Sequence, residues 1–100
     1  MAMTPEKKVK QTVTKYLKEY GNDIYYFYPT TGGYGRSGVP DIIGCYKGMF
    51  FAVECKAGKN TTTKLQELEI AKVNNAGGKA WVVSEQNVDS IHTALASLVK

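Results

Sequence analysis

Apolar residues recur every three or four positions near the start of the chain, a pattern typical of a helix that packs on one face. The positions that form this stripe are Val9, Val13, Tyr16, Leu17 and Tyr20. Thr4 is a suitable N-cap, Pro5 fits the first helical position, and Gly21 ends the pattern. We therefore predict a helix that begins at Pro5 and ends before Gly21.

Three runs rich in β-branched, aromatic and small apolar residues follow this helix, and such runs favour strands. They cover residues 24–28, 41–46 and 49–56. The Gly-, Thr- and Ser-rich stretch 29–40 predicts a loop, and Lys47-Gly48 is typical of a tight hairpin turn. Neither strand of the predicted hairpin has a clean polar face, so we expect both sides of the sheet to be covered.

The second half of the chain alternates helix, strand and helix. A helix from about Lys64 to Ala76 has N-cap candidates at Thr61 to Thr63 and ends at Gly77-Gly78. A short strand at 80–83 and an amphipathic helix at 88–99 follow. Because a helix joins the third and fourth strands, that pair is expected to be parallel with a right-handed crossover. The predicted order α-β-β-β-α-β-α is an α/β fold, a small mixed β-sheet with helices on both faces.

Length and composition fit one globular domain spanning residues 1–100, with 43% hydrophobic and 22% charged residues. No apolar run approaches the roughly 20 residues that cross a bilayer, and the N-terminus lacks a signal-peptide pattern. We therefore expect a cytoplasmic protein that makes no membrane contact. The net charge of +4 mildly favours polyanionic partners. Two cysteines are too few for a disulfide framework, so both are expected to be free thiols.

The hairpin turn predicts where the charged residues of its strands meet. If Lys47-Gly48 is a two-residue turn, Asp41 lies directly across from Glu54. Side chains alternate along a strand, so Lys56 shares the face of Glu54. Three ionisable groups are therefore expected to converge at the open end of the hairpin.

Such a cluster suits a divalent cation, because two adjacent carboxylates repel each other unless a positive charge lies between them. Carboxylate oxygens favour Mg²⁺ or Mn²⁺. The alternative is a surface ion pair that contributes little to stability. Against that alternative, the neighbouring strand residues are apolar, and charges among apolar residues are costly unless paired or ligating.

Two further polar residues are candidates for the same site. Glu6 shares the helical stripe of Val9 and Val13, so it could reach the metal; alternatively, it only complements the helix dipole. Gln66 has helical spacing with Ile70 and Val73, so it could face the sheet and orient Lys56 or a phosphate. An exposed, helix-favouring glutamine is the alternative.

These residues match a known pattern. Gly38-Val39-Pro40-Asp41 followed by Glu54-Cys55-Lys56 resembles the signature of the PD-(D/E)xK nuclease superfamily. The small size, the Glu6 helix and the stretch from Thr62 to Gln66 most resemble the VRR-NUC family. The resemblance extends from Glu6 to about Ser84 and implies a restriction-endonuclease-like core.

The resemblance also implies a role for each site residue. Asp41, Glu54 and the backbone carbonyl of Cys55 would bind Mg²⁺ or Mn²⁺, and Lys56 would position or activate the attacking water. The helix acid and the glutamine of the family correspond to Glu6, a possible further metal ligand, and Gln66. The implied activity is that of a metal-dependent endodeoxyribonuclease.

Nucleic-acid contacts are expected beside this cluster. In the loop before Asp41, Arg36 could hold a phosphate and Tyr34 could stack on a base. Lys59 and Lys64 flank the start of the following helix, where backbone amides also favour anions. An ordinary surface loop and a solvated charged turn are the respective alternatives.

The substrate and the partners are the least specified features. Small stand-alone members of the family resemble Holliday-junction resolvases, which suggests branched or junction DNA. A domain this small covers little duplex, so a symmetric homodimer with two sites is expected. Such a nuclease would fit a phage protein acting in the bacterial host cytoplasm. A non-catalytic nucleic-acid-binding module on the same scaffold and a nuclease acting on RNA stay open as alternatives.

Overall fold

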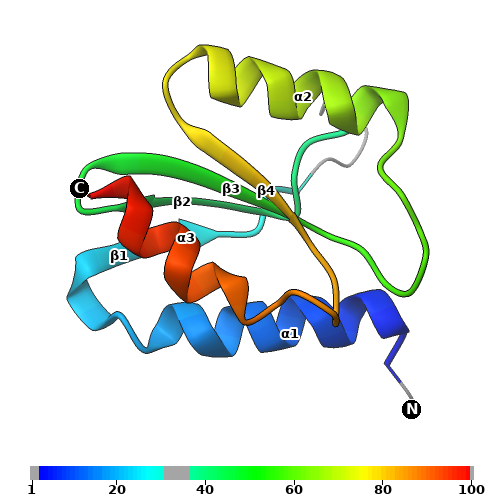
Figure 1. Cartoon of the computed structure of the whole chain (residues 1–100), viewed down its shortest axis with the longest axis horizontal. Coiled ribbons are helices and arrows are strands. Elements are labelled where there is room, and N and C mark those ends of the chain that lie inside the picture. Colours follow the sequence, from blue (N-terminus) through cyan, green and yellow to red (C-terminus); the bar gives the residue numbers. More distant parts are fainter. Residues whose placement is uncertain (1–2, 31–36, 100) are drawn as a thin grey trace.

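The computed structural model describes residues 3–30 and 37–99. These residues form one four-stranded sheet with α2 on one face and α1 and α3 on the other (Figure 1). The sheet order is β1-β2-β3-β4, with the first two pairs antiparallel and the last pair parallel. The predicted element order and the mixed, helix-flanked sheet are therefore confirmed. The elements are α1 Pro5–Lys18, a 3-10 turn Gly21–Asp23, β1 Ile24–Phe27, β2 Ile42–Tyr46, β3 Met49–Cys55, α2 Lys64–Asn75, β4 Lys79–Val83 and α3 Ser90–Leu98.

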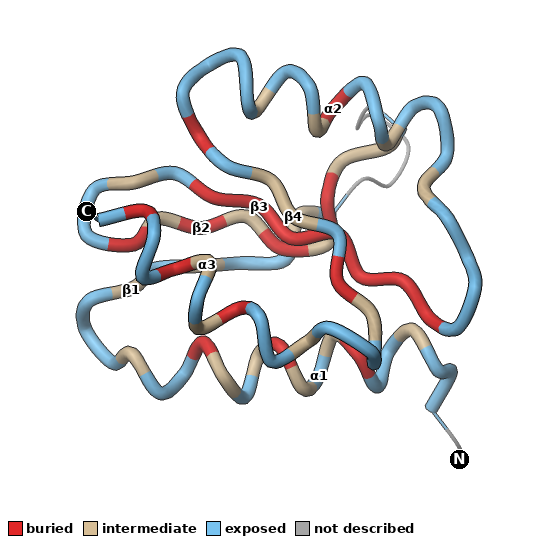
Figure 2. The backbone as a smooth tube through the Cα atoms, in the orientation of Figure 1, coloured by how far each residue is buried: buried red, intermediate tan, exposed pale blue. Residues whose placement is uncertain are grey.

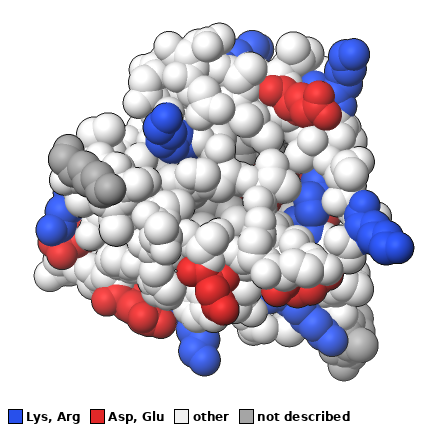
Figure 3. Space-filling view, viewed as in Figure 1, with Lys and Arg blue, Asp and Glu red and all other residues white. Residues whose placement is uncertain are grey.

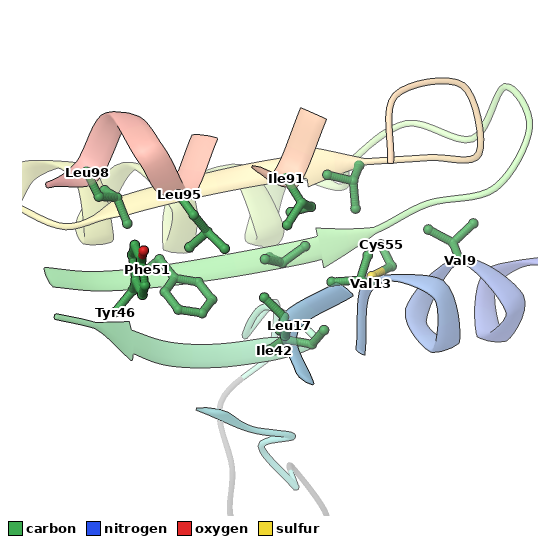
Figure 4. Packing of buried hydrophobic residues seen from close by; sticks show 12 residues of the cluster. Val9, Val13, Leu17, Ile42, Tyr46, Phe51, Cys55, Ile91, Leu95 and Leu98 are labelled. Carbon is green, nitrogen blue, oxygen red and sulfur yellow. The ribbon is translucent and has the colours of Figure 1, made fainter. Parts of the chain in front are cut away.

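The core lies between the sheet and the two helices α1 and α3 (Figure 4). Val13 and Leu17 of α1 and Ile91 of α3 are fully buried there. They pack against strand residues that include Phe51 and Val53, which are also fully buried. Burial of each large side chain contributes about 1.5–3 kcal/mol to stability. Buried residues are concentrated along β3, whereas the outer sides of α1 and α2 are mostly exposed (Figure 2).

The β2–β3 hairpin has the predicted register. Lys47 and Gly48 both have positive φ, at 49° and 87°, as a type I′ turn requires. Tyr46 therefore pairs with Met49, and the pairing continues to Ile42 opposite Val53. This register determines which residues meet at the open end of the hairpin.

Two helix boundaries differ from the prediction by about two residues. The first helix ends at Lys18 because Glu19 and Tyr20 already form tighter bonds to carbonyls three residues back, at 3.1 Å. The last helix begins at Ser90, because the residues before it form a turn closed by a 2.9 Å bond from Ser90 N to the Asn87 carbonyl.

One further expectation is met within residues 3–30 and 37–99. Cys45 and Cys55 are free thiols. No helix in this part of the chain is long and apolar enough to cross a membrane.

Candidate active site

The open end of the hairpin brings an aspartate to the end of the central strand. Asp41 directly precedes β2, one residue beyond the last strand pair, Ile42 and Val53, so continuation of the register places it next to Glu54. The Asp41 carboxylate accepts a 2.8 Å hydrogen bond from the backbone amide of Cys55 through Oδ2. This bond holds Asp41 against the end of β3.

Glu54 and Lys56 form a buried ion pair on the same strand end. Lys56 Nζ lies 3.8 Å from Glu54 Oε2, and the two side chains are only 11% and 4% exposed. The backbone of Lys56 is held by a 2.8 Å bond from its amide to the Val83 carbonyl at the end of β4. Burial of two charges costs several kcal/mol each before their attraction is counted, so this pair is weak evidence for a purely stabilising role.

The first turn of α2 supplies a further contact to Glu54. Gln66 Nε2 donates a 3.1 Å hydrogen bond to Glu54 Oε2. The other end of the amide, Oε1, accepts a 2.8 Å bond from the Thr63 amide, while Thr63 Oγ1 accepts from Gln66 N at 3.2 Å. This capping box fixes the orientation of the Gln66 amide, so that its NH₂ group faces the carboxylate. The expectation that Gln66 faces the sheet is confirmed, although its partner is Glu54 and not Lys56.

The electrostatic environment opposes ionisation of Glu54. Burial, then the negative charge of Asp41, raises the pKa of Glu54 from 4.5 to about 8, although Lys56 acts in the opposite direction. One carboxyl of the pair therefore retains a proton at neutral pH unless a further cation approaches. Two adjacent carboxyl groups that cannot both be ionised without a further cation fit the ligand set of a divalent metal ion.

Asp41 and Glu54 would supply only part of the coordination shell of such an ion. Within the described residues, no three His, Cys, Asp or Glu side chains group closely enough to hold a metal. Mg²⁺ commonly uses one or two carboxylates and takes its remaining ligands from water and substrate phosphate. Asp41 and Glu54 match that pattern.

Glu6 lies near this pair without completing a group of three. Its side chain is half-buried, and its negative charge is the smallest of the effects that raise the pKa of Glu54. It therefore lies within electrostatic range of Glu54, in the first turn of α1.

Lys10 is a site residue that the sequence-based prediction missed. Its Nζ lies 3.8 Å from Asp41 Oδ1 and 5.8 Å from the centre of the Tyr28 ring. The available signal was its position four residues after Glu6, because such residues share one side of a helix. Two lysines therefore flank the carboxylates, Lys56 from the sheet and Lys10 from α1.

Gly38 explains how the loop before Asp41 is attached. Its φ is +85°, and a Cβ atom at this position would lie 2.6 Å from the carbonyl carbon and oxygen of Leu65. Only glycine permits this close approach to the first turn of α2. The same turn carries Gln66, so one short segment of α2 contacts both Glu54 and the loop that precedes Asp41.

The candidate nucleic-acid contacts are only partly described. Lys59 is exposed on the connection between β3 and α2, and Lys64 is exposed at the first position of α2. Figure 3 shows that Lys and Arg side chains are spread over this face of the molecule, with Asp and Glu side chains among them. Arg36 and Tyr34 lie outside the described residues.

Two residues with reactive side chains belong to the core instead. The Cys55 side chain points toward α1 beside Val13 (Figure 4), and burial raises the pKa of its thiol to about 12. His92 Nδ1 is 2.7 Å from Tyr20 Oη where α3 packs on α1. Neither side chain takes part in the carboxylate cluster.

Known protein families and solved structures share features with this chain. The family model described as "Archaeal holliday junction resolvase (hjc)" matches residues 6–95. A solved structure titled "VRR_NUC domain" superimposes with a TM-score of 0.74 at 22% identity, over 91% of this chain and 97% of that one. Another, titled "VRR_NUC domain protein", gives a TM-score of 0.66 at 17% identity, over 99% and 91%. At these identities the two structures show a shared fold. No curated protein matches the chain.

Proposed function

The chain belongs to the archaeal Holliday junction resolvase family, and from this premise we propose that it is an endodeoxyribonuclease dependent on Mg²⁺ or Mn²⁺. Membership of this family supports a nuclease. Its proposed reaction is hydrolysis of phosphodiester bonds, and its proposed substrate is branched or junction DNA.

The observation that carries the proposal is the buried Asp41–Glu54–Lys56 cluster. Glu54 and Lys56 are only 3% and 9% exposed as whole residues. The Asp41 carboxylate next to Glu54 makes ionisation of both carboxyl groups unfavourable without a further cation. Four elements hold these groups, since α1, β3, β4 and α2 each contribute a contact. A site held this firmly suits chemistry that depends on preorganised charge.

The protein groups have distinct proposed roles. Asp41, Glu54 and the carbonyl of Cys55 would hold the ion, which when bound supplies positive charge at the scissile phosphate and lowers the pKa of water. Lys56 would position the attacking water and offset the negative charge that develops on the phosphoryl oxygens. Gln66 would keep Glu54 oriented, as its hydrogen bond already does.

Cleavage of a four-way DNA junction by the purified full chain tests the proposal. We expect nicking with Mn²⁺, loss on addition of chelator, and a decrease of about 100-fold or more in the Glu54→Gln variant. Glu67→Gln is the matched control, because Glu67 is an exposed glutamate of α2. Equal cleavage by Glu54→Gln and the wild type would contradict the assignment.

The same experiment separates the alternative functions. Salt-sensitive binding that chelator leaves unchanged, with no cleavage in any metal, would instead indicate a non-catalytic binding module. Preferential cleavage of an RNA strand of the same sequence would indicate that RNA, and not DNA, is the substrate.

We also propose that the protein is a homodimer, supported by an apolar region on the face of the sheet that carries α2. Tyr25 and Phe27 of the edge strand are 69% and 45% exposed, and Phe50 is 44% exposed. Tyr25 and Phe50 both pair with Cys45, so they share one face. Light scattering should give twice the 11.0 kDa chain mass, and Tyr25→Lys/Phe27→Lys should give the monomer. A wild-type monomer at high concentration would refute this.

A further inference from the structure

A groove of about 410 Å³ runs along the side of α1 that faces Tyr28. Its polar lining comes from Lys7, Lys10, Gln11, Thr14, Lys18 and Tyr28. Thr14 and Tyr28 are hydrogen-bonded through their hydroxyl groups, which ties this side of the helix to the end of β1. No Asp or Glu is among the described residues that line the groove.

The net positive charge of the chain is concentrated on α1, the helix that lines this groove. The helix holds five lysines and one glutamate, so it carries the full +4 excess, and the remaining residues hold eight cations and eight acids. Lys7 and Lys18 are exposed and have no ion-pair partner among the described residues. Their charges are therefore available to a ligand.

The spacing of these residues matches an extended ligand. Lys7, Gln11, Thr14 and Lys18 recur every three or four positions, so they lie on one side of the helix. The two outer lysines are eleven positions apart, which corresponds to about 16 Å along the helix axis. A single small anion needs no row of this length, whereas a chain of phosphates does.

Lys10 joins the groove to the candidate active site. It lines the groove, and its Nζ also lies 3.8 Å from Asp41 Oδ1. A polyanion seated along α1 would thus lead directly to the carboxylate cluster.

We propose that this groove binds the sugar-phosphate backbone of the DNA beside the scissile bond. The inference rests on the proposed function, because it assigns part of the substrate to a surface next to that site. Lysines act on phosphates as mobile point charges and carry no base-specific information, so the contact would be independent of sequence. Its role would be to fix the position of the strand relative to Asp41 and Glu54.

The test compares two double variants that remove the same charge. Lys7→Gln/Lys18→Gln changes the groove, and Lys10 is left intact because it contacts Asp41. Lys47→Gln/Lys79→Gln is the control, because these exposed lysines lie at the hairpin-turn end of the sheet, away from the cluster. Fluorescence anisotropy of a labelled four-way junction in chelator gives Kd over about 50 to 200 mM salt.

We expect Lys7→Gln/Lys18→Gln to reduce the slope of log Kd against log salt by about 1 to 2, while the control keeps the wild-type slope. Equal slopes for both double variants, or no DNA binding by the wild type, would overturn the proposal. Thermal melting of both variants shows whether the fold is intact. Cleavage with Mn²⁺ is measured separately. A wild-type protein that binds the junction but does not cut it would refute the proposed nuclease activity and would leave the proposed role of the groove intact.

Discussion

The raised pKa of Glu54 predicts that the metal-free protein loses stability as pH rises. The folded state holds the Glu54 proton up to about pH 8, whereas an ordinary glutamate releases it near 4.5. Between these values the folded chain binds more protons than the unfolded chain, so the free energy of unfolding falls with increasing pH. Each pKa unit corresponds to about 1.4 kcal/mol, so the loss reaches at most about 5 kcal/mol by pH 8.

Glu54→Gln isolates this effect, because glutamine has nearly the same size and can still accept the hydrogen bond from Gln66. Urea unfolding in chelator at pH 5, 6.5 and 8 would measure the free energy of unfolding. We expect the wild type to lose several kcal/mol across this range and the variant to lose little, so that the variant is the more stable protein at pH 8. Glu19→Gln, which changes an exposed glutamate, should follow the wild type. Parallel pH curves for Glu54→Gln and the wild type would refute the reasoning.

Three further substitutions test individual parts of the site. Lys56→Gln should lower kcat for junction cleavage by about 100-fold or more with Kd changed less than about threefold, whereas a matching loss of binding would contradict its catalytic role. Gly38→Ala should lower the free energy of unfolding by about 2 kcal/mol or more, because its Cβ would meet the Leu65 carbonyl at 2.6 Å; unchanged urea unfolding would show that the loop adjusts. Cys55→Ala should retain cleavage within a few-fold, since the proposed ligand is its backbone carbonyl, and abolished cleavage in a folded variant would indicate a role for the thiol.

The hairpin was predictable from sequence because its information is local. A two-residue turn at Lys47-Gly48 determines every pair that follows, down to Ile42 opposite Val53. The position of Asp41 beside the end of β3 follows from that register. Gln66 was predictable to the level of a helix face, because helical spacing places it toward the sheet.

The parts of the site that were not predicted from sequence depend on contacts between distant segments of the chain. Lys10 reaches Asp41 only because α1 packs on the face of the sheet with this residue near the open end of the hairpin, and helical spacing alone does not reveal that packing. Gly38 was part of the recognised motif, but the reason for glycine is its contact with Leu65, 27 positions further along the chain. The roles of Arg36 and Tyr34 stay predictions.

The central claim is that Asp41 and Glu54 share a divalent cation, and a crystal structure with Mn²⁺ tests it most directly. Anomalous scattering locates the ion without reference to activity. The account predicts one ion bound by both carboxylates, with the Cys55 carbonyl in its coordination shell. An ion bound elsewhere at saturating Mn²⁺, with these carboxylates left out and DNA cleavage intact, would contradict it.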